Sequence, residues 1–342
     1  MNGFKTRIFS AALASLLMLS GCVGGSGGSD GGSKIEEDKD VAFMIGDVEV
    51  TNADFYTGYC CTKNSYEKEQ GISDWNAAID GSTTYHDLLM ENCTVSSAFM
   101  AWMLSKAGDF DIQIDPEEQA RIQEDADRMK GLITKEQREQ FGITDEDIEL
   151  AAEHSAVSNA VFEAYGEKLK EELTDDEKNG CICGEYRFIA VYKKEAGTGD
   201  ETSSKDDDAE TRIRDAQEAL KGGMSMKKAI ETYSDSRRET GVRAEEKVII
   251  ARNGMVRDSG YVLEKRLSEA VNPLEDGSIS EIIETVRGYY IFECVKAVSN
   301  KETEAAVDIL VQNKITAEFS SWMDRSDISY SDLYAETIKN GR

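Results

Sequence analysis

The stretch GEYRFIAVY, residues 184–192, decides how this chain divides. β-branched and aromatic residues dominate it, and that composition is typical of a β-strand. A charged segment that ends in glycine, TDDEKNG at residues 174–180, comes directly before it. Apolar residues upstream of that segment recur every three to four positions, as in helices. The sequence therefore predicts a helical region, a boundary, and then a unit that mixes strands and helices.

Downstream of this strand, the pattern predicts three helices and then two further strands. These are residues 209–221, 225–233, 263–270, 280–286 and 289–298. The two strands are expected to turn at Arg287-Gly288. A last helix, residues 303–324, has an apolar side but no domain of its own. We expect it to pack back against the first helical region.

The first region opens with a strand signal and continues with helix signals. Residues 41–50 predict a hairpin around Gly46-Asp47, and residues 51–54 predict the cap of a helix that begins near residue 53. Residues 62–82 are polar and predict a loop that carries Trp75. The remaining helices are expected at residues 84–107, from Asp115-Pro116 onward, and from 144 to 173. The helix at 84–107 is so apolar that it is either core or a surface for a partner.

Charge and histidine content exclude several function classes. The chain has 342 residues, 39 Lys and Arg against 67 Asp and Glu, and a formal net charge of −28. Such a surface repels phosphate backbones, so nucleic-acid binding is excluded. Only two histidines are present, His86 and His154, which rules out a multi-histidine metal site or active site. Both are expected to be packed structural side chains, and no motif for a cofactor or metal is present.

The N-terminus has the pattern of an export signal. Lys5 and Arg7 precede an apolar run, residues 8–19, that is too short for a mature membrane span. It ends in LSGC, residues 19–22, which resembles the bacterial lipobox, whose cysteine is lipidated after cleavage. This predicts a signal peptide at 1–21, lipid attachment at Cys22 and a Gly/Ser-rich tether at 22–40. Removing Lys5 and Arg7 takes the net charge from −28 to −30.

Six cysteines remain after Cys22. An exported chain with an even number of cysteines permits disulfides, but six allow fifteen pairings, so the connectivity is left open. Their spacing is not that of zinc or thioredoxin C-x-x-C pairs. Structural thiols, disulfides and a metal or redox role all stay open for Cys60, Cys61, Cys93, Cys181, Cys183 and Cys294.

With these motifs in place, the chain resembles the parvulin-type foldase lipoproteins, which are PrsA-like and related to the chaperone SurA. The lipobox, the hairpin opening, the charged break and the terminal helix occur in that family's order. Three segments of the α+β unit also resemble the family: ALKGGMSMKKAIETYS at 219–234, the run from Asn253 to Ser280, and GYYI at 288–291. The resemblance covers nearly the whole mature chain.

The chain departs from the family at the positions that matter for its chemistry. Parvulins carry one histidine in the first strand and one in the last, and both line the prolyl pocket. Here Phe188 and Tyr290 stand at those positions, and Met226 stands where an aromatic residue is usual. The Gly-Gly-Asp-Leu-Gly stretch of the family is also missing. The resemblance implies a degenerate groove near Phe188, Met226, Met255 and Tyr290, with no confident catalytic residue.

The resemblance implies an α+β fold with two parts. A helical SurA/PrsA-like chaperone domain is formed by residues 41–178 and 300–342, and a parvulin-like domain of antiparallel sheet and helices, 181–299, is inserted between them. Its partners would be unfolded exported polypeptides, bound in part by Phe99, Trp102 and Met103. The expected location is the outer face of a bacterial cell membrane.

Three functions stay open at this point. The first is a membrane-anchored folding factor that binds unfolded chains and has a degenerate isomerase domain. The second is an active peptidyl-prolyl cis-trans isomerase, because a groove that desolvates the X-Pro bond can help rotation without histidine. The third, from another class, is a solute-binding or surface-interaction lipoprotein, which would be expected to have two lobes with parallel sheets.

Overall fold

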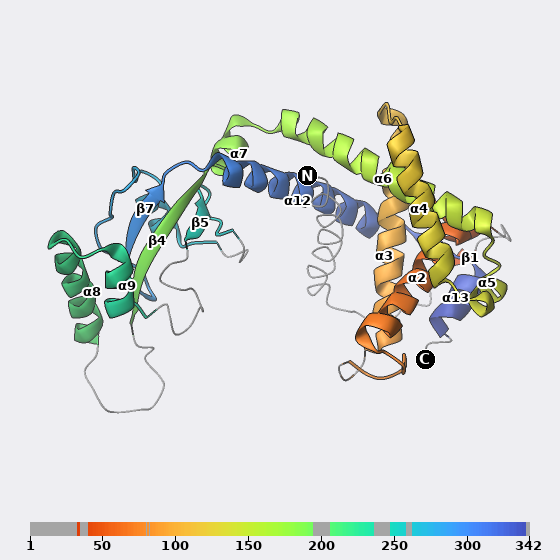
Figure 1. Cartoon of the computed structure of the whole chain (residues 1–342), viewed down its shortest axis with the longest axis horizontal. Helices are drawn as coiled ribbons and strands as arrows, with labels where there is room; N and C mark the ends of the chain where they lie inside the picture. The colour runs from red at the N-terminus through yellow and green to blue at the C-terminus, as the bar shows by residue number, and fades with distance from the viewer. Residues whose placement is uncertain are drawn as a thin grey trace. The chain divides into compact units, whose positions relative to one another are not determined.

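The structure is a computed structural model that describes residues 33–34, 40–79, 81, 83–193, 206–235, 247–257 and 262–339. The predicted signal peptide, the lipid-attachment residue Cys22 and nearly all of the tether lie outside the described residues. Where residues are described, the elements are helices and mainly antiparallel strands, so the fold is α+β (Figure 1).

The chain forms two compact units. Unit 1 extends to Lys168 and resumes at Lys314, and unit 2 comprises Leu169–Asn313. Two long helices, α6 (Asp145–Glu172) and α12 (Asn300–Arg325), cross the boundaries between the units. The C-terminal segment thus belongs to the same unit as the N-terminal half, although a whole unit separates them in sequence.

Unit 1 contains a small sheet that joins both ends of the chain. The hairpin of β2 (Val41–Ile45) and β3 (Val48–Thr51) turns at Gly46, whose φ of +61° suits glycine. The sheet order is β1-β8-β2-β3, with β1 at Ser33–Lys34 and β8 at Ile328–Tyr330. β8 pairs antiparallel with β2 and parallel with β1. The hairpin was predicted from the sequence, whereas β8 was not.

Helix caps define the start of the helices in unit 1. Thr51 caps α2 (Asn52–Gln70), Thr84 caps α3 (Tyr85–Ser105) with a capping box through Asp87, and Asp115 caps α4 (Pro116–Leu132). α2 ends at Gln70, nine residues later than the sequence predicted, and Gly71 in the left-handed conformation is its C-cap. The segment 62–70 is helical because its lysines, glutamates and glutamine favour a helix despite their polarity.

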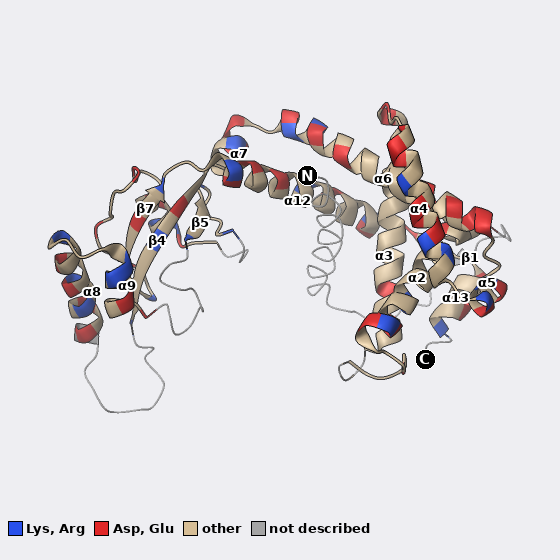
Figure 2. Ribbon diagram, viewed as in Figure 1, with Lys and Arg blue, Asp and Glu red and all other residues tan. Residues whose placement is uncertain are grey.

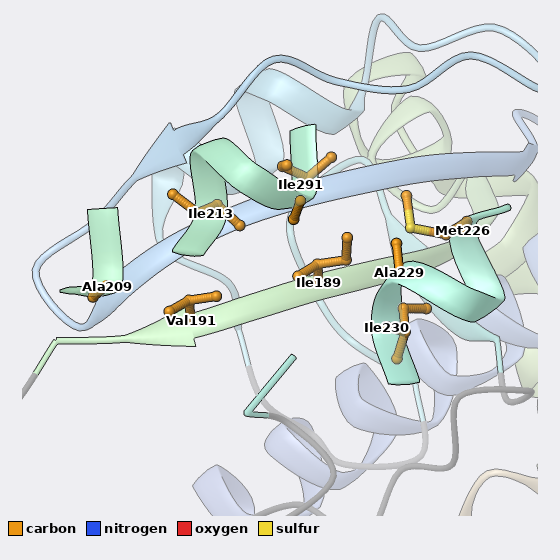
Figure 3. Packing of buried hydrophobic residues seen from close by; sticks show 9 residues of the cluster. Ile189, Val191, Ala209, Ile213, Met226, Ala229, Ile230 and Ile291 are labelled. Atoms are coloured by element: carbon orange, nitrogen blue, oxygen red, sulfur yellow. The ribbon is translucent and has the colours of Figure 1, made fainter. Parts of the chain in front are cut away.

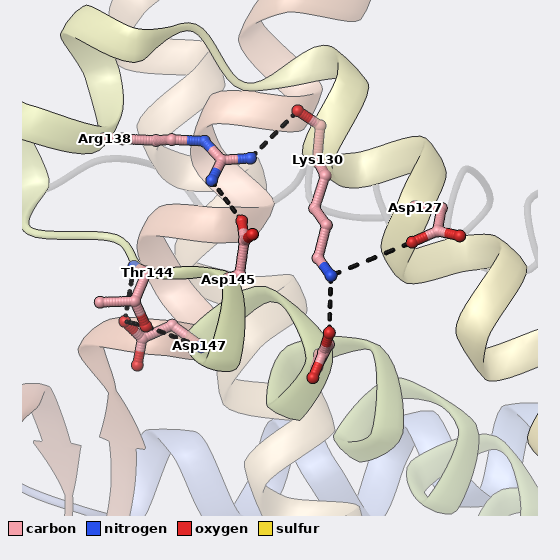
Figure 4. Close-up of polar contacts among 7 residues, drawn as sticks. Asp127, Lys130, Arg138, Thr144, Asp145 and Asp147 are labelled. Carbon is pink, nitrogen blue, oxygen red and sulfur yellow. Dashed lines mark hydrogen bonds and ion pairs between the residues drawn. The ribbon is translucent and has the colours of Figure 1, made fainter.

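Ion pairs connect three successive helices of unit 1, α4, α5 (Lys135–Phe141) and α6. Lys130 Nζ lies 2.6 Å from Glu149 Oε1, and Arg138 donates to Asp145 at 2.5 Å and to the Lys130 carbonyl at 3.1 Å (Figure 4). Thr144 caps α6 through Asp147, as the sequence predicted. Figure 2 shows acidic residues along α4 and α6. Most of those outside these ion pairs are exposed. Much of the chain's negative charge is therefore exposed to solvent on these two helices.

A predominantly aromatic cluster holds α12 to α3 within unit 1. Phe319 lies 5.2 Å from Phe99 and 5.5 Å from Trp102 between ring centroids, and Trp322 stacks on Trp102 at 6.1 Å. Lys106 Nζ sits 4.4 Å above the Trp102 ring and forms an ion pair with Glu318 at 3.1 Å. A short helix that the sequence did not predict, α13 (Asp332–Lys339), then packs Tyr334 against Phe43 and Phe55.

Unit 2 is built on a four-stranded antiparallel sheet in the order β5-β4-β7-β6. The strands are β5 (Val248–Ala251), β4 (Cys183–Tyr192), β7 (Gly288–Lys296) and β6 (Ile283–Glu284). The first residue of β7 must be glycine, because a Cβ on Gly288 would lie 2.4 Å from the Val191 carbonyl oxygen. The turn into β7 is fixed by Thr285, which hydrogen-bonds with Gly288.

Helices α8 (Asp206–Lys221) and α9 (Met226–Tyr233) cover one face of this sheet. The core between this face and the two helices is aliphatic (Figure 3). It consists of Ile189, Val191, Ala209, Ile213, Ala216, Met226, Ala229, Ile230 and Ile291. Arg212 ties α8 to the end of α9 through Asp235 at 2.6 Å and the Tyr233 carbonyl at 2.9 Å. The short helices α7 (Asp175–Gly180) and α11 (Lys265–Val271) complete the described part of the unit. Of the helices that the structure describes, none is long and apolar enough to cross a membrane.

Candidate functional site

The face of the unit 2 sheet opposite α8 and α9 is aromatic. Side chains alternate along a strand, so Tyr186 and Phe188 of β4 share this face with the cross-strand residues Tyr290 and Phe292 of β7. Phe188 pairs directly with Phe292, and their rings stack at 5.5 Å. Tyr290 stacks on Phe292 at 6.4 Å and meets Tyr192 edge-on at 6.4 Å. We call these five rings the aromatic face. Three of them belong to β4 and two to β7: Tyr186, Phe188, Tyr192, Tyr290 and Phe292.

The cover over this face is incomplete. Leu267 and Val271 of α11 are buried against Tyr186 and Phe292, which are 3% and 2% exposed. Phe188 and Tyr290 lie at the margin of the same cluster and are only half-buried. The two positions that the family resemblance assigns to histidine therefore hold rings that are packed on one side and accessible on the other.

The four groove residues predicted from the sequence do not form one surface. Met226 is 3% exposed and belongs to the aliphatic core under α8 and α9, on the other face of the sheet from Phe188 and Tyr290. The prediction that Met226 lines the groove is wrong, because the helix that carries it packs on the opposite face of the sheet. Met255 is half-buried beside β5, where its carbonyl accepts a hydrogen bond from the Ala251 amide at 2.9 Å.

The described residues of the aromatic face offer mainly apolar contact, and the titratable groups whose pKa values shift there are moved away from neutral pH. Burial raises the pKa of the Tyr186 phenol to about 12, and burial also raises the pKa of the Cys294 thiol. Arg187 and Glu293 pair at 3.1 Å, and strand alternation puts them on the other face from Phe188 and Tyr290. Among the residues that the structure describes, the arrangement presents apolar ring surface, with its nearest ion pair on the opposite face of the sheet.

The predicted client-binding residues of α3 lie in the interior of unit 1. Phe99 and Trp102 are each 4% exposed and Met103 is fully buried. Phe319 and Trp322 of α12 cover the two aromatic rings. An unfolded chain could touch them only if α12 moved away, so they are core side chains here rather than an accessible surface. The sequence left open whether this apolar helix is core or a surface for a partner, and in the structure these side chains are core.

The six cysteines described are all free thiols. Five are buried and Cys61 is half-buried. Desolvation raises the pKa of Cys60 and Cys93 to about 12 and that of Cys61 and Cys183 to about 11. Buried thiols with raised pKa values are poor nucleophiles. Among the described residues, no group of three or more His, Cys, Asp or Glu is arranged to hold a metal ion.

The two histidines play different structural parts in unit 1. His154 of α6 lies with Nδ1 3.0 Å from both carboxylate oxygens of Asp54, which also accepts a hydrogen bond from the Thr51 hydroxyl at 2.8 Å. The hydrogen bond with Asp54 raises the pKa of His154. His86 at the start of α3 is 5% exposed, and its Nδ1 has no hydrogen-bond partner. Burial lowers the pKa of His86.

Sequence reasoning missed a cavity that His86 lines. It lies between α2, the loop at 71–79, α3, α5 and α13, and has a volume of about 360 Å³. The only sequence signal was a tryptophan, Trp75, in an otherwise polar loop. Nothing in the sequence placed it beside His86.

No protein-family model matches the sequence, and a search of curated proteins finds no match. Among solved structures, the chain is similar to the peptidylprolyl isomerase PrsA from Bacillus cereus, with 18% identity and a TM-score of 0.33 over 79% of this chain and 100% of that one. It is similar to the foldase protein PrsA from Streptococcus pneumoniae, with 14% identity and a TM-score of 0.29 over 91% and 93% of the two chains. A SurA-like chaperone of Campylobacter jejuni matches with 12% identity and a TM-score of 0.23 over 85% and 99%.

Proposed function

We propose that this protein is an extracytoplasmic folding factor that binds unfolded exported polypeptides and has a degenerate prolyl isomerase domain. The observation that carries the proposal is the half-covered aromatic face around Phe188 and Tyr290. Apolar side chains of an unfolded client would pack against these rings. Removing exposed aromatic surface from water lowers the free energy, and large rings contribute most to this term. Phe188 and Tyr290, rather than the buried residues of α3, are the proposed client contacts.

The absence of histidine from this face supports binding without efficient catalysis. Isomerisation is rotation about an X-Pro bond, with a barrier of about 20 kcal/mol and no covalent step. Phe188 and Tyr290 can desolvate such a bond. One phenyl and one phenol ring provide fewer hydrogen-bonding groups than the two imidazoles that the family resemblance implies.

Charge would shape the choice of client. The mature chain would carry a net charge of −30, and the acidic side chains of α4 and α6 are exposed. A surface of one sign attracts chains of the opposite sign over distances up to about 10 Å at 0.1 M salt. Basic unfolded polypeptides are therefore the favoured clients.

An aggregation assay tests client binding. The chain from residue 22 onward, with Cys22→Ser to prevent lipidation, is mixed with reduced and denatured lysozyme, a basic protein, and light scattering is followed. We expect suppression of aggregation that falls by about half or more in the double variant Phe188→Ser and Tyr290→Ser. Val286→Ser is the matched control, because Val286 is 88% exposed in the same unit but outside the aromatic face.

The proposal fails if the unmodified sequence does not reduce scattering, or if Val286→Ser weakens suppression as much as the double variant. A thermal melt of each variant separates loss of binding from loss of folding. Raising the salt concentration should weaken suppression of lysozyme aggregation, since screening shortens the reach of the acidic surface.

A proline-peptide assay tests the degenerate isomerase domain. The cis-to-trans relaxation of an Ala-Pro peptide takes tens of seconds without catalyst at 25 °C. We expect the same relaxation rate with and without the protein. An acceleration that disappears in the double variant would instead assign active prolyl isomerase activity to the aromatic face.

We further propose that Cys22 carries the lipid that anchors the protein at the outer face of the cell membrane. The LSGC pattern and the short apolar run before it support this. Cells expressing the full sequence and the Cys22→Ser variant are labelled with a radioactive fatty acid and fractionated. Label and membrane association are expected only with cysteine at position 22, and a labelled serine variant would contradict the assignment.

A further inference from the structure

The cavity beside His86 in unit 1 has walls of aromatic rings. Tyr59 of α2 and Phe141 of α5 meet edge-on at 5.8 Å, and Tyr59 meets the His86 ring at 6.4 Å. Trp75 forms another wall and is fixed by its Nε1–H, which donates to Glu67 at 2.7 Å. Its volume of about 360 Å³ is at the small end of the range for ligand sites, enough for one or two residues of a peptide.

Backbone hydrogen bonds hold the loop at 71–79 against the start of α3. The His86 amide donates to the Trp75 carbonyl at 2.9 Å, and the Tyr85 amide donates to the Ala77 carbonyl at 3.2 Å. The Asp74 carboxylate is engaged by the Asn76 amide at 3.1 Å. The Trp75 wall is therefore tied to α3 rather than hanging free, which gives the cavity a preformed shape.

One charged side chain of the lining has no carboxylate partner. The ammonium group of Lys63 lies 5.7 Å from the centre of the Trp75 ring, a cation–π contact, and forms no ion pair with any described residue. His86 also lines the cavity, but its Nδ1 has almost no accessible surface and makes no hydrogen bond. Lys63 is therefore the charged group that a ligand in the cavity could meet.

We infer that this cavity is a binding site for a carboxylate next to an aromatic or aliphatic group, with Lys63 meeting the carboxylate and the rings of Tyr59, Trp75 and Phe141 holding the apolar part. Lys63 supplies a charge-assisted hydrogen bond. The C-terminal residue of a peptide and a free small carboxylate share this chemistry. The site is in unit 1 and does not depend on the function proposed for the aromatic face.

Paired probes test the inference with the chain from residue 22 onward. N-acetylphenylalanine has the carboxylate, and N-acetylphenylalaninamide has the same ring without it. By calorimetry we expect the acid to bind at least about tenfold more tightly than the amide, equivalent to about 1.4 kcal/mol. In Lys63→Met this preference should fall to about twofold or less. Lys135→Met is the matched control, since Lys135 is in the same unit and its side chain is 83% exposed.

The indole resonances locate the ligand. The chain has three tryptophans, so Trp75→Phe assigns one of three indole N–H signals in a proton–nitrogen spectrum. The acid should shift the Trp75 signal in the unmodified sequence and in Lys135→Met. A five-residue peptide that ends in phenylalanine separates the two sources: if it also shifts the signal, the site takes a chain end, and if only the small acid does, it takes a free carboxylate.

Three results would overturn the inference: no binding of either probe at millimolar concentration, equal affinity for acid and amide, or an unchanged preference in Lys63→Met. Tighter binding of phenethylamine, a cation of similar size, would also overturn it by assigning the charge selectivity to Asp74. None of these outcomes bears on client binding at Phe188 and Tyr290, so the two proposals can fail separately.

Discussion

The two units both gather aromatic rings, but they finish the packing differently. In unit 1, Phe99 and Trp102 are covered by Phe319 and Trp322 from the returning helix α12, and each is 4% exposed. In unit 2, α11 covers one end of the aromatic face and leaves Phe188 and Tyr290 half-buried. Rings of the same chemistry thus serve as core in one unit and as accessible surface in the other.

This contrast shows that the role of an aromatic cluster depends on how completely other elements bury it, and not on the residue type alone. A fully covered ring contributes its whole burial free energy to folding. A half-covered ring contributes less to folding and keeps apolar surface for a partner. The variants below test the contrast in order of expected effect.

Trp102→Ala should cause the largest loss of stability. Truncating a fully buried aromatic side chain removes its transfer free energy and leaves a cavity, at a cost of about 3–5 kcal/mol. The free energy of unfolding is measured by urea denaturation of the chain from residue 22 onward. Leu150→Ala, at a side chain 40% exposed on α6, is the control and should cost less than about 1 kcal/mol. Equal losses in the two variants would contradict the assignment of Trp102 to the core.

Gly288→Ala should destabilise unit 2 by an intermediate amount. The added methyl group would lie 2.4 Å from the Val191 carbonyl oxygen and 2.9 Å from Tyr192 Cα, so β7 must move away from β4. Overpacking of this kind costs about 1–3 kcal/mol. Gly277→Ala is not a suitable comparison, because Gly277 has φ of +78° and strains any other residue. Gly58→Ala is better matched, since a Cβ there meets nothing within 4 Å, and it should raise or preserve the melting temperature.

Phe188→Ala should destabilise the protein less than Trp102→Ala, because its ring is less completely buried. We expect a cost of about 1–2 kcal/mol in urea denaturation. The same variant should weaken the suppression of lysozyme aggregation, whereas Trp102→Ala should leave it unchanged at temperatures where that variant is folded. The opposite result, with client binding lost only in Trp102→Ala, would move the client surface from unit 2 to unit 1.

The ion pair between His154 and Asp54 should produce the smallest effect, seen as a change with pH. The folded pKa of His154 is raised above its usual value of about 6.5 by its hydrogen bond to Asp54. Its charged form therefore stabilises the fold fully below about pH 6.5, and the contribution is lost as pH rises through the folded pKa. The free energy of unfolding lost in His154→Gln should be larger at pH 6 than at pH 9. An equal loss at both pH values would show that only the neutral hydrogen bond matters.

Local signals predicted much of the fold correctly. The hairpin at Gly46-Asp47, the Asp115 and Thr144 caps and the strand at 184–192 depend on residues within a few positions of one another. The hydrophobic pattern of the sequence did not predict two C-terminal elements, the strand β8 and the helix α13. The strand of β8 is only three residues long and gains its hydrogen bonds from β2, nearly three hundred residues earlier.

The candidate sites were predicted less well than the fold. Phe188 and Tyr290 were found because they stand where a family pattern has histidine, and strand register then brings them to one face. Met226 was grouped with them wrongly, because sequence spacing does not reveal which face of a sheet a helix covers. The cavity at His86 was invisible, since its walls come from five separate segments.

By itself, the sequence determined the strongly acidic composition, the scarcity of histidine and the positions of most helices and strands. These properties follow from composition and from periodicity along the chain. The tertiary structure alone decided which aromatic rings are covered and which lysine and histidine face a cavity. Covering requires a second element from elsewhere in the chain, and only long-range packing brings α12 to Trp102 while leaving Phe188 partly open.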